Sequence, residues 1–382
     1  MPTACSPREM LARLVAFATI SARSNLDLVG FVEAYLADHG VASFRDPDAT
    51  GDKASLVAMV GPATEGGVVL SGHTDVVPVE GQPWTGDPFT LSGRDGKLFG
   101  RGVCDMKGFL ACALAAVPAM QAARLRRPII LALSRDEEIG CVGAAPMIEA
   151  LLAALPRPEA VIVGEPSEMR VVTGQKGSWG FRARVRGHEV HSSLLPTGVS
   201  AVMEAAGMID WMRRAMDAAA RATPPNEFDP PYTTIHVGLI AGGTANNITA
   251  RDCSFSGELR CLPDESVAVW RDRMLAEAAR RSAAMQAIRP GTGIVFETRM
   301  ELPGFAASGP AEALARALTG DNGRHVVSYQ TEAGHFQARG LSTVICGPGS
   351  IAQAHQPDEF ITEDQLAAGS AFVHRLIDRL AA

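Results

Sequence analysis

Apolar and polar positions alternate along the chain in two different ways. The outer stretches contain short apolar runs separated by segments with helical spacing. The runs predict buried strands at residues 55–60, 67–70, 129–134, 160–163 and 342–346. The segments around them predict helices at residues 7–19, 25–38, 105–123, 143–155 and 363–380. Strands that alternate with helices predict an α/β fold with a mostly parallel sheet and helices on both faces.

A different pattern occupies the middle of the chain. Every second residue from Trp179 to Val185 is apolar, and between and after them lie Arg182, Arg184 and Arg186. This alternation is typical of a strand with one face in water. Similar strands are expected at residues 235–239, 254–261 and 294–298, and helices at 199–216 and 265–287. The order strand, helix, two strands, helix, strand predicts a ferredoxin-like α+β domain.

We therefore expect one domain to be inserted into another. The outer domain comprises residues 1–176 and 302–382, and the inserted domain comprises residues 177–301. A length of 382 residues agrees with two domains, since domains hold roughly 100–200 residues each.

Composition excludes several classes of protein. The apolar share of 47% and charged share of 20% are typical of a soluble globular protein. A net charge of -7 and a pI near 5.8 argue against binding to nucleic acid, because that requires a basic surface. No segment reaches the ~18 apolar residues that span a membrane.

The amino-terminal region and the cysteines point to the cytoplasm. Ser6 is a predicted helix cap, followed by Pro7 and, three residues after the cap, by Glu9. This is a helix start, and a signal peptide is not expected. The seven cysteines are scattered, without a CxxC motif, as in proteins whose thiols stay reduced.

Acidic residues and histidines follow several of the predicted strands. Glu137 and Glu138 come just after the strand at 129–134. Carboxylates at the end of a buried strand need a partner or a metal ion. Further candidates of this kind follow other strands, loops or turns: His73, Asp105, Glu165 and His355. One such ligand from each of several segments predicts a metal site, although a solvated acidic turn at 137–138 and a helix cap at Asp105 are simpler alternatives.

Four further local patterns bear on the chemistry. His73 and Asp75 are two residues apart on extended chain, so one can bind a metal while the other holds its ring. Residues 81–102 are rich in Gly, Pro and Asp and are expected to form a long loop. Within it, residues 91–98 fail as a phosphate loop, since leucines replace its first glycine and its hydroxyl residue. His188 and His191 are spaced by three residues and do not form a helical zinc motif. Arg260 lies on the polar face of its strand, where its guanidinium can bind a carboxylate.

Taken together, these segments carry a resemblance to a known family. The whole chain resembles the acetylornithine deacetylases, within the family of two-zinc aminoacylases, succinyl-diaminopimelate desuccinylases and carboxypeptidase G. The matching blocks follow the family's order over nearly the full length and cover residues 71–75, 102–108, 136–140, 163–166, 191–196, 242–247, 258–260 and 347–359.

The resemblance implies roles for individual residues. His73 and Glu165 would bind one metal ion, Glu138 and His355 the other, and Asp105 would bridge both, with a cis peptide bond to Met106. Glu137 would be the general acid and base, and Asp75 would steady His73. His191 would stabilise the oxyanion, often across a dimer formed by the inserted lid domain. Asn247 and Arg260 would contact the substrate carboxylate.

The implied activity is metal-dependent hydrolysis of an N-acyl amino acid, with N2-acetyl-L-ornithine as the expected substrate. Two divalent ions are expected, zinc first, with cobalt or manganese as alternatives. A desuccinylase or a broad aminoacylase of the same family is the alternative enzyme, and a non-catalytic binding protein is the alternative class. Glu332 is a further candidate, as a contact for the substrate ammonium group. A homodimer is expected, and neither nucleic acid nor a membrane is expected as a partner.

Overall fold

The computed structural model describes residues 5–21, 23–306 and 309–381. The chain divides into two compact units. Unit 1 comprises Met1–Gly174, Ala307–His325 and Thr331–Ala382, and unit 2 comprises Gln175–Ala306 and Val326–Gln330. The chain therefore enters unit 2 a second time after residue 325, which the sequence pattern did not predict.

The main sheet of unit 1 has strands in the order β1-β2-β6-β3-β7-β15-β8. Neighbours among β6, β3, β7 and β15 run parallel, whereas β1, β2 and β8 pair antiparallel at the two sides. The bounds are Ser43–Pro47 (β1), Ala54–Val60 (β2), Val68–His73 (β3), Ile129–Ser134 (β6), Ala160–Pro166 (β7), Val172–Gln175 (β8) and Thr343–Gly347 (β15). The prediction of a mostly parallel sheet is confirmed.

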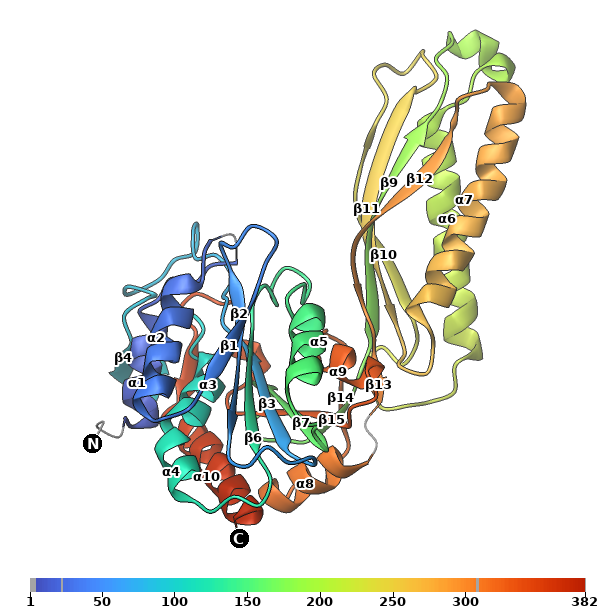
Figure 1. Cartoon of the computed structure of the whole chain (residues 1–382). Helices are drawn as coiled ribbons and strands as arrows, with labels where there is room; N and C mark the ends of the chain where they lie inside the picture. Colours follow the sequence, from blue (N-terminus) through green and yellow to red (C-terminus); the bar gives the residue numbers. More distant parts are fainter. Residues whose placement is uncertain (1–4, 22, 307–308, 382) are drawn as a thin grey trace. The chain divides into compact units, whose positions relative to one another are not determined.

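The central strands read as continuous apolar runs because helices cover both faces of the sheet (Figure 1). Every residue of β3, β6 and β7 is buried. One face carries Pro7–Val15 (α1), Leu26–Asp38 (α2), Lys107–Ala115 (α3), Val117–Ala122 (α4), Pro310–Thr319 (α8) and Glu363–Leu380 (α10), whose buried apolar residues share one core. The other carries Ala144–Ala154 (α5) and Ala333–Ala338 (α9).

Two local predictions for unit 1 need correction. The single helix predicted at residues 105–123 is wrong, because α3 ends at Ala115 and α4 begins at Val117. Pro118 lies in the first turn of α4, where its missing N–H is tolerated but a continuous helix is not. The long loop predicted at 81–102 contains two strands, Ser92–Arg94 (β4) and Lys97–Phe99 (β5), which form a small sheet with Phe360–Thr362 (β16).

Unit 2 has a four-stranded antiparallel sheet in the order β10-β11-β9-β12. Its elements are Gly177–Arg186 (β9), Ser192–Thr197 (η1), Ala201–Ala222 (α6), Thr234–Gly242 (β10), Asp252–Cys261 (β11), Val267–Ile288 (α7) and Gly293–Leu302 (β12). Both helices contribute to a separate core with Trp179, Phe181 and Phe255. The predicted order of strands and helices is therefore observed. Two short strands, Phe305–Ala306 (β13) and His325–Val327 (β14), lie where the chain passes between the units.

Candidate metal centre

The predicted metal ligands of unit 1 lie at the carboxyl end of the parallel strands. His73 is the last residue of β3 and is paired in register with Ser134, the last residue of β6. Glu137 and Glu138 follow three and four residues later, and Glu165 lies near the end of β7. This edge of an α/β sheet is where such folds place their sites, because parallel strands end there together.

Asp105 lies between two histidines from distant parts of the chain. Its Oδ1 is 3.0 Å from Nε2 of His73, and its Oδ2 is 3.5 Å from Nε2 of His355. The same nitrogen of His355 is 3.0 Å from Oε2 of Glu138, and Nε2 of His73 is 3.9 Å from Oε1 of Glu165. The two oxygens of one carboxylate thus face two separate groups of candidate ligands.

Ligand atoms from these residues form two overlapping groups. One consists of His73, Asp105 and Glu138, and the other of His73, Glu137 and Glu165. Within each group all ligand atoms lie within 4.8 Å of one another. Imidazole and carboxylate donors at this spacing fit divalent metal ions such as zinc, cobalt or manganese.

The second ring nitrogen of His73 is also held. Nδ1 lies 2.9 Å from the carbonyl oxygen of Asp75 and 3.6 Å from its carboxylate. An Nδ1–H that donates to this carbonyl leaves Nε2 free to bind a metal. The carboxylate of Asp75 accepts from Ser21 Oγ at 2.7 Å and from the backbone N–H groups of Glu137 and Glu138 at 3.1 and 3.3 Å. Asp75 therefore ties the end of β3 to the acidic pair.

The backbone has an uncommon conformation close to the acidic pair and at one candidate ligand. Asp136 has φ 56° and His355 has φ 64°, a left-handed conformation that is uncommon outside glycine. Such conformations cluster at functional sites because the surrounding structure must hold them in place. The peptide bond between Asp105 and Met106 is cis, as the resemblance implied.

The charges of the site require cations. Four carboxylates gather here with two histidines, and among the described residues no lysine or arginine forms an ion pair with any of the four: Asp105, Glu137, Glu138 and Glu165. Burial and the charges of Glu138 and Asp105 raise the pKa of Glu137 to about 8. Hydrogen bonds that the His355 ring donates to the carboxylates of Asp105 and Glu138 raise the pKa of His355 to about 10. A divalent ion displaces such protons when it binds, so this donor set fits metal ions.

Sequence reasoning missed two residues that support the site. The carboxylate of Glu359 accepts hydrogen bonds from the backbone N–H groups of Gly102 at 2.9 Å, Cys104 at 2.8 Å and Asp105 at 3.1 Å. It also pairs with Arg101 at 2.9 Å, and both side chains are only 1% exposed. Glu359 therefore fixes the loop that carries Asp105. The available signal was an acid in the block 355–359, four residues after a candidate ligand.

The interpretation of Glu332 as a substrate contact is wrong. Glu332 is only 1% exposed, and its carboxylate accepts hydrogen bonds from the hydroxyl groups of Ser71 and Ser134. These serines belong to β3 and β6, so Glu332 joins two strands inside the domain. A buried carboxylate that two hydroxyl groups already bind is not available to a substrate.

Two of the three candidates in unit 2 lie together. His191 caps η1 and accepts from the N–H of Ser193 at 3.2 Å. The N–H of Ser192 donates to the carbonyl oxygen of Asn247 at 2.9 Å, and both candidates are exposed. His191 and Asn247 therefore lie on adjoining loops at one end of the sheet.

Arg260 lies toward the other end of the same sheet. Its guanidinium donates twice to the carboxylate of Glu258, at 3.0 and 3.2 Å, and once to the carbonyl oxygen of Ser328 at 2.9 Å. A substrate carboxylate would have to compete with Glu258 for this group. Asp252 begins β11, and Arg260 lies eight residues further on, which is about 27 Å along a strand that rises about 3.4 Å per residue.

The chain belongs to a family of metallohydrolases. Residues 69–379 match the family described as Peptidase family M20/M25/M40. An acetylornithine deacetylase from Myxococcus xanthus is 34% identical over 97% of this chain and 96% of that protein. The resemblance seen in the sequence is thereby confirmed.

Solved structures show the same fold. A tripeptidase from Staphylococcus aureus superposes with a TM-score of 0.75 at 18% identity, covering 99% of each chain. A dinuclear metal-binding peptidase of the M20 family from Bacillus subtilis gives a TM-score of 0.65 at 14% identity, covering 98% of each chain. The chain is therefore an enzyme of the M20 metallohydrolase fold, and none of the helices that the structure describes is long and apolar enough to cross a membrane.

Proposed function

We propose that the protein hydrolyses the amide bond of N2-acetyl-L-ornithine to give L-ornithine and acetate, as a cytoplasmic step of arginine biosynthesis. The observation that carries the reaction type is the position of Asp105 between His73 and His355, with three more carboxylates close by. The choice of substrate rests on the deacetylase from Myxococcus xanthus, which is 34% identical over nearly the full length of both proteins.

The residues at the strand ends would hold two divalent ions. His73 and Glu165 would bind the first, Glu138 and His355 the second, and Asp105 would contribute one oxygen to each. Zinc is our first choice, because imidazole and carboxylate donors suit it, and cobalt and manganese suit the same set. When bound, such ions lower the pKa of a water molecule and polarise the acyl carbonyl group.

Glu137 would move the proton during hydrolysis. It accepts a proton from the attacking water and returns it to the nitrogen of the departing amine. Its position supports this role, since it is partly exposed while its neighbours Asp105 and Glu165 are buried. Its backbone N–H is anchored to Asp75, which keeps the side chain on the side of the candidate ligands.

Unit 2 would supply the contacts to the substrate. We assign His191 to the oxyanion of the tetrahedral intermediate, and Asn247 and Arg260 to the substrate carboxylate. A well-placed oxyanion donor contributes roughly 3–4 kcal/mol. His191 is exposed on its loop, and its imidazole is oriented by Ser193, which leaves Nε2 available as a donor.

The arrangement of unit 2 supports a homodimer. Asp252, at the end of β11 next to the loop that carries Asn247, lies about 27 Å along the strand from Arg260, which is too far for one small amino acid to span. Two chains that exchange these loops would give each site one contact from its own chain and one from its partner. The edge strand β10 offers an interface, since Leu239 is 72% and Ile240 54% exposed.

Substrate comparison tests the proposal. The protein, stripped of metal and reloaded with zinc or cobalt, is given N-acetylornithine, N-acetylmethionine and N-succinyl-diaminopimelate. The highest kcat/KM on N-acetylornithine would support the deacetylase. The highest value on either other compound would replace it with the aminoacylase or the desuccinylase. A protein that takes up about two ions per chain but releases no product from any of the three would contradict the proposed reaction.

A further inference from the structure

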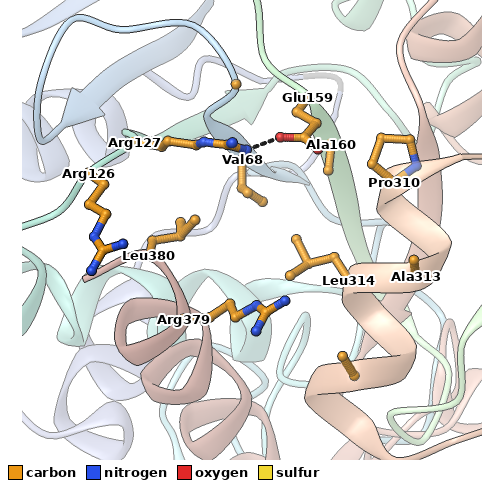
Figure 2. Close-up of a pocket in the computed structure, with 12 residues that line it drawn as sticks. Val68, Arg126, Arg127, Glu159, Ala160, Pro310, Ala313, Leu314, Arg379 and Leu380 are labelled. Carbon is orange, nitrogen blue, oxygen red and sulfur yellow. Dashed lines mark hydrogen bonds and ion pairs between the residues drawn. The ribbon is translucent and has the colours of Figure 1, made fainter. Parts of the chain in front are cut away.

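Unit 1 has a pocket away from the candidate metal centre (Figure 2). Its volume is about 520 Å³, within the range of roughly 300–1,000 Å³ that is typical of small-molecule pockets. It is bordered by Val68 and Ala160, which are the first residues of β3 and β7, and by helices α8 and α10. It therefore opens at the amino end of the parallel strands.

This position separates the pocket from the chemistry. Val68 and His73 are the two ends of β3, five residues apart, which corresponds to about 17 Å at the rise of a parallel strand. None of the residues to which we assign metal, proton transfer or substrate lines the pocket. A ligand bound here would not touch the proposed reaction.

The middle of the pocket is apolar. Val68, Leu314 and Leu380 present aliphatic side chains to it, and Ala313 and Ala317 line the side formed by α8. Leu314 and Leu380 are only partly buried and pack at the edge of the main core. Removing these groups from water stabilises a bound aliphatic chain.

The rim of the pocket is basic. Arg126, Arg127 and Arg379 line it together with a single acidic residue, Glu159, which pairs with Arg127. The side chains of Arg126 and Arg379 form no hydrogen bond or ion pair within the part of the chain that the structure describes. Two guanidinium groups are thus uncompensated on a protein whose net charge is -7.

We propose that this pocket binds a short aliphatic anion, with a carboxylate or phosphate head on Arg379 and Arg126 and its chain against Val68, Leu314 and Leu380. Guanidinium groups bind both kinds of head in a fork, which places the negative charge at the basic rim. In Figure 2 the side chains of Arg127 and Arg379 lie on opposite sides of the apolar middle. A neutral or cationic molecule of the same length lacks the attraction to the rim.

The test is a calorimetric titration, in which small-molecule probes are added to the metal-loaded protein. The probes are hexanoate and hexyl phosphate, with hexanol and hexylamine as uncharged and cationic controls. We expect binding of at least one anion and none of the two controls. Tighter binding of hexanoate would identify a carboxylate site, and tighter binding of hexyl phosphate a phosphate site.

Variants decide where the probe binds. Arg379→Ala should weaken binding by about tenfold, the usual effect of removing one charged hydrogen bond. Arg221→Ala removes the same charge from an exposed position in unit 2 and should change nothing. Ala317→Trp fills the pocket from an exposed helix position and should abolish binding while the protein stays folded and hydrolytically active.

Three outcomes would overturn the proposal. One is binding of hexanol or hexylamine as tight as that of the anions. Another is anion binding that survives both Arg379→Ala and Ala317→Trp but disappears when the metal is removed. That second result would place the probe at the metal centre. Absence of binding by both anions at millimolar concentration would also contradict the proposal.

Discussion

The two units use their sheets in opposite ways. In unit 1, parallel strands end at one edge, and candidate ligands from residues as far apart as His73 and His355 come within a few ångströms of Asp105. In unit 2, an antiparallel sheet carries Asn247 near one end and Arg260 near the other. A parallel sheet gathers groups from one chain, whereas a long antiparallel strand separates them. The comparison predicts that unit 1 holds its metal site alone and that two copies of unit 2 serve each substrate.

Metal removal should have the largest effect on this comparison. Chelation should abolish hydrolysis and lower the melting temperature, because the clustered carboxylates then repel one another. A ligand present at 1,000 times its Kd stabilises by about 4 kcal/mol. Thermal unfolding and acetate release are measured before and after addition of zinc. A chelator already saturated with zinc is the control, and unchanged melting and activity after chelation would show that no metal site exists in unit 1.

Glu137→Gln should come next. It removes the proposed proton carrier, so kcat should fall by about 10²–10⁴-fold. Metal content, measured by elemental analysis, should stay at the wild-type value because all five proposed ligands are intact. Glu65→Gln is the matched control, because Glu65 is exposed and pairs with no cation among the residues that the structure describes. A variant that keeps most of its activity would remove Glu137 from the proposed role.

Glu359→Ala should loosen the loop that carries Asp105. Breaking a buried ion pair costs about 3–5 kcal/mol, and loss of a group that orients a ligand lowers metal affinity by about 10–100-fold. Adding Arg101→Met removes the uncompensated charge and should recover part of the stability. It should not recover metal affinity, since three backbone N–H groups still lack their acceptor. Recovery of both quantities would assign Glu359 to stability alone.

Arg260→Ala and Asn247→Ala test whether two chains share each substrate. Each should lower kcat/KM by about 10–100-fold, the effect of losing a hydrogen bond to a charged group. Mixing the two variants under exchange conditions should restore activity to about a quarter of wild type, because half of the dimers are mixed and each has one intact site. No restoration would mean that one chain supplies both contacts, and an unchanged kcat/KM for Arg260→Ala would remove it from the site.

Leu239→Lys should have the smallest effect on unit 1. A charge on the exposed edge strand β10 should shift the protein from dimer to monomer and reduce activity, while metal content stays unchanged. Val295→Lys is the matched control, since Val295 is 63% exposed on β12 at the other edge of the sheet. Sedimentation velocity gives the oligomeric state. Monomers from both variants, or from neither, would contradict the interface at β10.

Sequence patterns predicted the fold of unit 1 wherever a run was long and uniform. The strand at 129–134 and the helix at 363–380 were predicted with their observed bounds, because both have clear limits and strong periodicity. The strands β4 and β5 were missed, since three residues carry too little pattern to separate a strand from a turn. The pairing of β5 with β16 depends on residues more than 250 positions away.

The residue types of the candidate site were predictable from the sequence, but the hydrogen bonds that hold these residues in place were not. Acids and histidines after strands are visible in the sequence, and their convergence follows from the parallel order of the strands. The hydrogen bonds of Asp75 to the N–H groups of Glu137 and Glu138 were not predictable, because side-chain partners depend on the folded backbone. The same holds for Glu332, whose burial beneath two serines is a tertiary feature.

The contact between Glu359 and Asp105 also sets an order of events during synthesis. The acceptor lies 254 positions after the N–H that it holds. A ribosome that adds about 5–20 residues per second needs roughly 10–50 s to cover that distance. Until then the loop with Asp105 has left the exit tunnel without its anchor and without His355. A growing chain thus cannot complete the centre, and an early stop near the carboxyl terminus would leave an almost full-length product with half a site.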